Sequence, residues 1–540
     1  MTIPCLPNFC RPILVGLLAL ALPMPTSAAP TPAPQWRAVE LEMSAQGTYE
    51  SPYTEVEVWA TFTHESGLTL IRPAFWDGGS RFKVRFASPV PSGLWTWKSD
   101  ANVDDPGLRG RTGELVAGPN TGRSVFDRHG FWTIPSGSRY LRHADGSSGI
   151  MVADTPWGIP WRATHEQVEI FADDREAKGF NAALLMSVQP DRRMDGPRDR
   201  TQHHGFARGF EDLPTGHINQ LNPEYFQYLD RSVTLLTDRG IAPVWQPVFH
   251  GYGWRGLDVA GPVIPPAEYA RYCRYLVARY GAHPAIWLVL GDGNGSEPGI
   301  RAGGQEIERW DAYRQPTGLH YGPHWPPQAH QSETWLDFQW VQTGHNGEHR
   351  QDRLAAMWYT QPVKAAANGE PTYENIGTWG KASGWWQGHE AWSNLCAGGT
   401  MGVVYGAGSL WNWIHPGEPT QNDGWARAQE NSWRQALEFE GSNYVGLMSK
   451  ILAGLPLEGI QPDTTTTYGR RGVFAPYQLL IVYLESGDTL SVLRHDIPQS
   501  WRVYDAKTGE VLKTGRLTDS EREVPATGDG PRVVIFSITY

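Results

Sequence analysis

The 540-residue chain has few cysteines, little charge and no run rich in lysine or arginine. Four cysteines are too few to make a disulfide scaffold at this length. The net charge is −11, so no basic surface is available for a general nucleic-acid partner, and we expect no nucleic-acid binding. Apolar residues form 40% of the chain and charged residues 19%, a balance typical of folded globular domains rather than of disorder.

Residues 1–29 have the pattern of a secretory signal peptide. Arg11 precedes a short apolar segment, and small residues follow, so we expect cleavage near Ala28 or Ala29. The apolar segment, Ile13 to Leu22, has about ten residues, which is too short to span a bilayer. We therefore predict a periplasmic or secreted protein without membrane contact after cleavage; an uncleaved anchor is the alternative. The sequence does not indicate the oligomeric state.

Hydrophobic periodicity divides the rest of the chain into three domains. Residues 35–120 alternate polar and apolar side chains between turns, which predicts an N-terminal β-sandwich. Residues 128–454 alternate apolar strand-like runs with amphipathic helical runs, which predicts a (β/α)8 TIM barrel. Residues 455–540 return to strand patterns and predict a C-terminal β-sandwich. The expected fold class is therefore α/β, a barrel flanked by two β-domains.

Eight strand-like segments support the barrel. In chain order they are Gly149–Ala153, Asn181–Val188, Ile241–Phe249, Ala285–Leu290, Gly318–Gly322, Leu336–Thr343, Val363–Asn368 and Met401–Leu410. A capping box at Thr164 starts the first helix. Further helices are expected at Pro223–Arg239, Pro266–Tyr280, Glu306–Arg314, Glu348–Tyr359, Gln387–Ala397 and Trp425–Glu438. No clear helix lies between the fifth and sixth strands.

The barrel also makes a prediction about the two thiols that remain after signal cleavage. Cys273 falls on the helix after the third strand, and Cys396 falls on the helix after the seventh strand. These helices lie on opposite sides of an eight-fold ring, whereas a disulfide needs Cα atoms within about 7 Å. We therefore expect two free, largely buried thiols.

Functional residues of a barrel lie at the carboxyl ends of its strands. Here those ends collect acids, imidazoles, amides and indoles, a mixture that suits a polar ring such as a sugar, and the chain has 25 tryptophans. We therefore expect a carbohydrate substrate. The candidate substrate-binding residues are Asp154, Trp157, Gln189, His250, Asn294, His324, Gln342, His345, Tyr373, Glu374 and Trp413.

Asp292 and Glu370 are the candidate catalytic residues, because they follow the fourth and seventh strands. Glycoside hydrolysis needs one carboxylic acid to protonate the leaving oxygen and one carboxylate to attack carbon or activate water. Glu374 is the rival of Glu370, and Glu297 is a weaker rival of Asp292. Asp154 has two open interpretations, a sugar ligand or a residue that fixes the first turn. Each tryptophan has packing as its alternative role.

Other chemistries lack their motifs. Gly291-Asp292-Gly293-Asn294-Gly295-Ser296 is similar to a dinucleotide-binding loop, but Ser296 occupies the position of the third glycine. The chain has no G-x-S-x-G, H-E-x-x-H, C-x-x-C or P-loop pattern. His203-His204 lies in the long segment Asp191–Asn222, and adjacent histidines rarely chelate one metal. We therefore expect no metal and no cofactor.

Four segments, in this order, resemble the apiosidase-like glycoside hydrolases, family 140 and its relatives. They are Asp154-Thr155-Pro156-Trp157, Trp287 to Asp292, Trp335 to His345, and Gly369-Glu370-Pro371-Thr372-Tyr373-Glu374. The segment Val39 to Lys98 is similar to the β-sandwich that often precedes such barrels, and Ser500 to Gly509 resembles the β-domain that often follows. The resemblance implies a secreted carbohydrate-active enzyme with Asp292 as acid/base and Glu370 as nucleophile.

The chain differs from that family in Gly293-Asn294-Gly295, where a larger side chain is common, and in its long segment Asp191–Asn222. Both differences border the expected pocket, so apiose is not inferred as the substrate. The resulting hypothesis is a glycoside hydrolase with two carboxylates, retaining and exo-acting. The alternatives are a non-catalytic carbohydrate-binding protein on the same barrel and a polysaccharide lyase.

Overall fold

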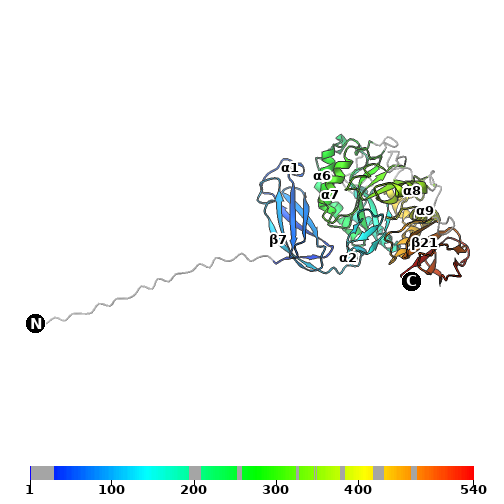
Figure 1. The fold of residues 1–540 in the computed structure, drawn as a ribbon. Coiled ribbons are helices and arrows are strands. Elements are labelled where there is room, and N and C mark those ends of the chain that lie inside the picture. Colours follow the sequence, from blue (N-terminus) through cyan, green and yellow to red (C-terminus); the bar gives the residue numbers. More distant parts are fainter. Residues whose placement is uncertain are drawn as a thin grey trace.

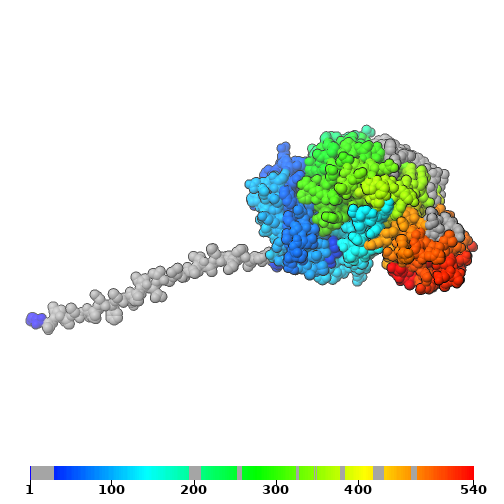
Figure 2. All heavy atoms as spheres, in the orientation of Figure 1, coloured from blue at the N-terminus to red at the C-terminus, as the bar shows by residue number. Residues whose placement is uncertain are grey.

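The computed structural model describes residue 1 and residues 29–193, 208–251, 258–323, 328–345, 347, 350–376, 384–417, 431–463 and 471–540. It contains a central α/β barrel between two β-domains (Figure 1). The N-terminal domain lies against one side of the barrel and the C-terminal domain against another, as the space-filling view also shows (Figure 2). This is the expected fold class.

The N-terminal domain is a seven-stranded sheet in the order β1-β7-β6-β3-β4-β5-β2. Its strands are β1 (Thr31–Pro34), β2 (Ala38–Ser44), β3 (Val58–His64), β4 (Thr69–Trp76), β5 (Arg81–Ala87), β6 (Gly93–Ala101) and β7 (Thr112–Gly118). The short helix α1 (Pro52–Glu55) lies between β2 and β3. Phe62 of β3 stacks on Phe86 of β5 with ring centroids 4.2 Å apart, so alternating apolar side chains fill the space within the folded sheet.

The barrel consists of eight parallel strands in the order β17-β16-β15-β14-β13-β12-β11-β18. They are β11 (Met151–Asp154), β12 (Ala182–Met186), β13 (Ala242–Gln246), β14 (Ile286–Gly293), β15 (Thr317–Tyr321), β16 (Phe338–Gln342), β17 (Ala365–Glu370) and β18 (Gly402–Tyr405). The Met401 amide donates to the Ala366 carbonyl at 3.2 Å, which brings the two end strands together. All eight expected strands are present.

Helices follow the barrel strands along the chain, and the longer ones lie on the outer side of the barrel (Figure 1). The helices are α3 (Ile159–Arg162), α4 (His165–Lys178), α5 (Pro223–Thr237), α6 (Pro266–Tyr280), α7 (Ile300–Trp310), α8 (Gln351–Tyr359), α9 (Trp385–Cys396), α10 (Gly408–Trp411), α11 (Trp433–Ala436) and α12 (Glu440–Leu452), with a 3-10 turn at Leu213–Thr215. The capping box at Thr164 forms as expected. Between β15 and β16, the described residues form no helix.

Several elements differ from the sequence prediction, and the helix α12 is absent from it. The expected strand Met401–Leu410 ends at Tyr405, because the small residues Gly406-Ala407-Gly408 turn the chain into α10. The expected helix Glu306–Arg314 begins earlier, at Ile300. Most of the first half of the expected helix Trp425–Glu438 lies outside the described residues, and the described part forms only the single turn α11.

Short elements complete the chain. A helical turn, α2 (Val125–His129), and a small sheet of β8 (Trp132–Thr133), β9 (Leu141–His143) and β10 (Ser148–Gly149) lead into the barrel. The C-terminal domain has a six-stranded sheet and a two-stranded sheet around one apolar cluster. Its strands are β19 (Gln461–Pro462), β20 (Arg471–Ala475), β21 (Leu479–Leu484), β22 (Leu490–Ser491), β23 (Ser500–Asp505), β24 (Val511–Arg516), β25 (Glu523–Val524) and β26 (Arg532–Ser537).

Cys273 on α6 and Cys396 on α9 are free and buried, which confirms the prediction made from the barrel. Burial raises the pKa of both thiols, that of Cys396 to about 12, so neither is a reactive thiolate. Among the helices of the described ranges, none combines the length and hydrophobicity that crossing a membrane requires.

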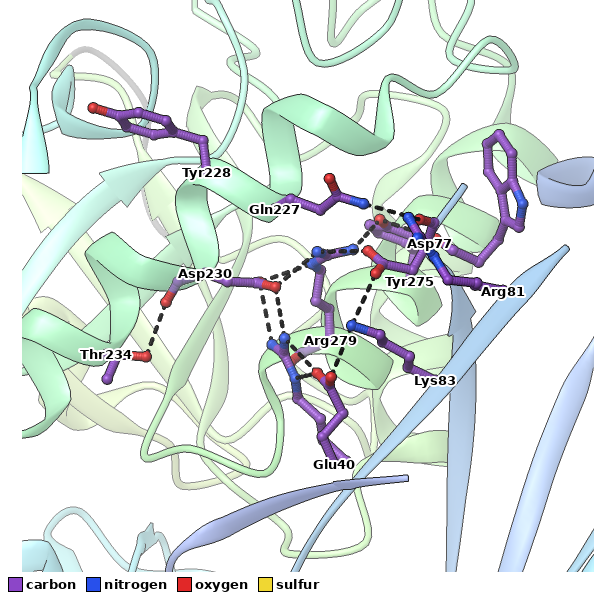
Figure 3. Close-up of polar contacts among 12 residues, drawn as sticks. Glu40, Asp77, Arg81, Lys83, Gln227, Tyr228, Asp230, Thr234, Tyr275 and Arg279 are labelled. Carbon is purple, nitrogen blue, oxygen red and sulfur yellow. Dashed lines mark hydrogen bonds and ion pairs between the residues drawn. The ribbon is translucent and has the colours of Figure 1, made fainter. Parts of the chain in front are cut away.

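A network of charged side chains joins the N-terminal domain to the barrel (Figure 3). Asp230 on α5 accepts paired hydrogen bonds from Arg279 on α6, at 2.8 and 2.7 Å, and from Arg85 on β5, at 3.2 and 2.6 Å. Arg279 also contacts Asp77, and Lys83 contacts both Asp77 and Glu40. Burial alone would raise the pKa of Asp230, but the two guanidinium groups lower it to about 2.

We predict that Asp230→Asn lowers the free energy of unfolding by about 3 kcal/mol, because two buried guanidinium groups lose their shared carboxylate. The folded-state pKa lies below the unfolded value, so this contribution is complete above about pH 4 and is lost as the pH falls toward 2. Urea unfolding at pH 7 and pH 3 measures both effects. Glu40→Gln, at a more exposed carboxylate of the network, should cost less than about 1 kcal/mol. Equal losses in the two variants would contradict this assignment.

Candidate active site

Both candidate catalytic carboxylates lie where the barrel strands lose their regular pairing. Gly291 pairs with His320 and Gly293 pairs with Tyr321, so Asp292 is an extra residue in β14. Its φ is 57°, an uncommon value for a non-glycine residue. Glu370 follows a similar irregularity in β17, where it pairs with Gln342. Because a bulge redirects the side chains beside it, these irregularities aim both carboxylates at the barrel mouth.

His320 on β15 joins the two carboxylates. Its Nε2 lies 2.9 Å from Asp292 Oδ1 and 3.1 Å from Glu370 Oε2. One oxygen of each carboxylate and one nitrogen of the imidazole all lie within 4.8 Å of one another. His320 is fully buried, and Asp292 and Glu370 are almost so. The structure therefore brings the two predicted catalytic residues together, with an imidazole between them.

Glu370 has a second imidazole partner. His345 Nε2 lies 3.0 Å from Glu370 Oε1, and its Nδ1 lies 3.0 Å from the Pro371 carbonyl. The Tyr373 ring lies 4.3 Å from the His345 ring and fixes its orientation. Each oxygen of Glu370 thus contacts a different histidine, which favours its ionised form.

The two carboxylates differ in pKa because their surroundings differ. Burial, together with the charge of Glu370, raises the pKa of Asp292 to about 6. Burial acts in the same direction on Glu370, but hydrogen bonds from His320 and His345 lower its pKa to about 2. Burial would lower the pKa of His320, and the two carboxylates raise it instead to about 9. A neutral acid beside an ionised carboxylate is the pairing that glycoside hydrolysis needs.

Two glycines, Gly291 and Gly369, let neighbouring side chains pack closely around Asp292, His320 and Glu370. A Cβ on Gly369 would lie 2.4 Å from the Trp340 ring and 3.0 Å from His320 Nδ1. A Cβ on Gly291 would overlap the amide of Gln246, at 1.3 Å. Neither His320 nor Gln246 is among the candidate site residues predicted from the sequence. His320 is the last residue but one of β15 and Gln246 is the last residue of β13, so the strand-end rule could have found both once the strand bounds were known.

Several other candidates lie close to the catalytic group. The Trp157 ring lies 5.9 Å from the His320 ring, and Tyr373 packs on His345 as described. Gln342 pairs with Glu370 across the strands, and its buried Oε1 has no partner among the described residues. The side-chain amide of Gln246 is likewise buried without a partner there. Such groups can bind substrate hydroxyls, because a buried polar atom without a hydrogen bond is unfavourable.

Two candidate carboxylates have structural partners. Asp154 is fully buried; its Oδ2 accepts from Arg175 at 2.5 Å and its Oδ1 from the Thr155 amide at 2.6 Å. Of its two open interpretations, this geometry favours the residue that fixes the first turn. Glu374 accepts from the Tyr405 hydroxyl at 2.8 Å and from backbone amides at the starts of α9 and α12. Through these contacts Glu374 joins β18 to α9 and α12, whereas its rival Glu370 faces Asp292.

The remaining described candidates have packing or backbone contacts of their own. Trp413 is buried and stacks on Trp433, with centroids 4.7 Å apart, as packing requires. His250 is buried, and its amide donates to the Gly291 carbonyl at 3.0 Å, so it supports the strand that carries Asp292. Gln189 is also buried. Asn294 Oδ1 accepts from Ser296 in the loop after β14. His324 lies outside the described residues.

The comparisons with known proteins agree with this geometry. The model of the apiosidase-like catalytic domain matches residues 135–458, which is more than half of the chain. The chain belongs to the apiosidase-like family. A second model, a domain of unknown function called DUF5060, matches residues 32–102 of this apiosidase-like protein. No curated protein sequence matches the chain.

Solved structures share the fold. A protein from Bacteroides vulgatus assigned as a glycoside hydrolase aligns with a TM-score of 0.68 at 16% identity, over 94% of this chain and 100% of that one. A family 5 glycoside hydrolase from the same species gives 0.57 at 18% identity, over 77% and 95%. Another glycoside hydrolase gives 0.59 at 18% identity, over 78% and 99%. Because the chain contains the apiosidase-like catalytic domain, the protein is a glycoside hydrolase.

The catalytic group also has the composition of a metal site. Asp292, His320 and Glu370 offer two carboxylate oxygens and one imidazole nitrogen, a donor set that Zn²⁺ accepts. However, His320 Nε2 is the nitrogen that donates to Glu370, and a metal ligand must give up that proton. The two carboxylates raise the pKa of His320, so a metal that bound here would have to displace the proton of that imidazole.

For this apiosidase-like enzyme we predict that His320→Gln moves both limbs of the pH profile of kcat/KM to higher pH. The positive charge of His320 lowers the pKa of both carboxylates, so its removal should raise each limb by about one pH unit or more. A role limited to packing would lower the rate without moving the limbs. The exposed histidine variant His129→Gln should match the wild-type profile.

Proposed function

We propose that this glycoside hydrolase cleaves glycosidic bonds with retention of configuration, through Asp292 as acid/base and Glu370 as nucleophile. The observation that carries the proposal is the short gap between the two carboxylates, with one oxygen of each within 4.8 Å. Retaining enzymes place their carboxyl groups about 5–5.5 Å apart, whereas inverting enzymes need about 6.5–9.5 Å to admit water. The gap supports retention.

In this mechanism Glu370 attacks the anomeric carbon while Asp292 gives its proton to the leaving oxygen. Formation of the covalent intermediate removes the negative charge of Glu370. Since that charge helps to raise the pKa of Asp292, its loss makes Asp292 more acidic and suits it to act as a base toward water. The attacking water restores the carboxylate of Glu370 and releases the sugar with its original configuration.

Three finer features belong to the same proposal. The substrate is a polysaccharide or oligosaccharide, supported by the polar and aromatic side chains Trp157, Gln342 and Tyr373 near the acids. Exo action is supported by the long segment between β12 and α5, which follows a strand at the active end of the barrel. Export is supported by the signal-like pattern of residues 1–29. The alternative of a non-catalytic binding protein does not explain why two acids of different acidity converge.

We predict that Asp292→Asn and Glu370→Gln each lower kcat by about a thousandfold or more, because each removes a group that changes protonation or bonding in the transition state. A panel of polysaccharides and oligosaccharides identifies the substrate of the wild-type enzyme, and cleavage of that substrate then provides the assay for the variants. The melting temperature of each variant should stay near the wild-type value. Glu42→Gln, at an exposed carboxylate of the N-terminal domain, is the matched control. Full activity in either catalytic variant would remove that residue from the mechanism.

Two measurements on the wild-type enzyme test the stereochemistry and the absence of a catalytic metal from this mechanism. NMR of the first product should show the anomer of the substrate, and the opposite anomer would indicate inversion. Dialysis against a chelator should leave the rate unchanged, whereas loss of activity that added Zn²⁺ restores would show that the donor set binds a metal.

The pH profile of kcat/KM gives a further prediction. Asp292 must be protonated to act as the acid, so activity should fall as the pH rises through its pKa of about 6. Glu370 must be ionised, and its low pKa keeps the acidic limb well below that value. A profile that stays flat up to about pH 8 would contradict Asp292 as the acid of the free enzyme.

A further inference from the structure

A buried carboxyl group lies behind the catalytic residues and takes no part in the proton transfers of the proposed mechanism. Glu390 on α9 is only 2% exposed. Its Oε2 accepts from the Thr372 amide at 3.1 Å, and its Oε1 lies 3.4 Å from the Thr343 hydroxyl. Thr343 follows β16 and Thr372 follows β17, so this one side chain contacts the segments that leave two neighbouring strands.

These two segments carry the pair of groups whose contact keeps the nucleophile ionised. Thr343 is two residues before His345, whose Nε2 lies 3.0 Å from Glu370 Oε1. Thr372 is two residues after Glu370 itself. Glu390 therefore contacts the chain close to both members of the pair, and a shift of either segment would change the distance between His345 and Glu370.

The side-chain amide of Asn368 determines the direction of the hydrogen bonds in this group. Its nitrogen donates to the main-chain carbonyls of Val341 and Glu370 at 3.1 and 3.2 Å, and its oxygen lies 2.8 Å from the Thr343 hydroxyl. Since the amide oxygen can only accept, it takes the single hydrogen of the Thr343 hydroxyl. The Thr343 oxygen then remains as an acceptor toward Glu390, and only a protonated carboxyl group can donate to it.

The surroundings of Glu390 favour that protonated form. Burial raises the pKa of Glu390 to about 7, although Thr372 and His345 act in the opposite direction. Asp292 must be protonated for catalysis, which requires a pH below about 6, and Glu390 is neutral in the same range. A neutral carboxyl group can donate one hydrogen bond and accept another without adding a further negative charge next to the active site.

We propose that Glu390 is a positioning residue, which holds the segments after β16 and β17 together so that His345 stays in hydrogen-bond contact with Glu370. The proposal rests on the proposed function, in which Glu370 must be ionised. Position 390 then needs one donor and one acceptor rather than a charge. Glutamine supplies both, whereas leucine, which has no polar side-chain atom, supplies neither.

The first test compares Glu390→Leu with Glu390→Gln in the full-length enzyme. In Glu390→Leu the acidic limb of the kcat/KM profile should move to higher pH by about one unit, because Glu370 loses contact with a histidine that lowers its pKa. The same variant should lose about tenfold or more in kcat, since the nucleophile is displaced. Glu390→Gln should keep the wild-type limb and a kcat within about twofold of the wild type.

The acidic limb separates positioning from packing. A residue that only fills space would lower the melting temperature of Glu390→Leu without moving the limb, and a limb that stays in place overturns the proposal. Thr343 provides a second pair of variants if Glu390→Leu does not fold. Thr343→Val removes the hydroxyl between Glu390 and Asn368 and should move the limb in the same direction, whereas Thr343→Ser keeps the hydroxyl and should not. Equal limbs in these two variants would also overturn the proposal.

A crystal structure of Glu390→Leu or Thr343→Val distinguishes this proposal from the proposed function. The distance from His345 Nε2 to Glu370 Oε1, 3.0 Å in the wild type, should become longer. If the wild-type enzyme cleaves no glycoside, the proposed function fails, and this distance still decides whether Glu390 positions His345. If the wild-type enzyme is active but the variants keep both the limb and the distance, only the positioning role is wrong.

Discussion

The position of one imidazole between two carboxylates determines most of the active-site chemistry. Asp292 and Glu370 are nearly buried, and two ionised carboxylates this close would repel each other strongly. His320 makes their approach possible because its Nε2 lies about 3 Å from each. The imidazole stabilises one negative charge on Glu370, and the burial of Asp292 favours its protonated form. The group therefore holds the proton and the ionised carboxylate that hydrolysis requires.

The backbone creates this arrangement at a local conformational cost. Asp292 adopts a positive φ as the extra residue of β14, and Gly369 marks the matching irregularity in β17. Regular strands would direct alternate side chains into the barrel and away from it, and the two acids would not converge as they do. The glycines at 291 and 369 leave space for Gln246, Trp340 and His320. Of the described non-glycine residues with a positive φ, Asp292 is the one that belongs to the candidate catalytic pair, and its strained backbone serves to aim its side chain.

The sequence predicts the barrel and the meeting of Asp292 with Glu370 because both depend on patterns of regular structure. Strand periodicity and the strand-end rule place Asp292 and Glu370 correctly at one rim, and the same pattern predicts the separation of Cys273 and Cys396. The sequence does not provide the register in which the strands and helices pack against one another. The contact of Asp154 with Arg175, and that of Glu374 with Tyr405, depend on how elements pack, so strand-end position alone cannot separate these buried acids from the catalytic ones.

The domain interface and the active site use the same electrostatic principle with different cations. At the interface, Asp230 lies between Arg279 and Arg85, whose guanidinium groups remain protonated at any physiological pH. In the active site, Glu370 lies between the imidazoles of His320 and His345. Both carboxylates have a lowered pKa. Arginine is not deprotonated in proteins, so its pair serves to hold the domains together. The His320 imidazole, whose pKa the two carboxylates raise to about 9, can lose a proton, and in the proposed mechanism its pKa falls when Glu370 loses its charge.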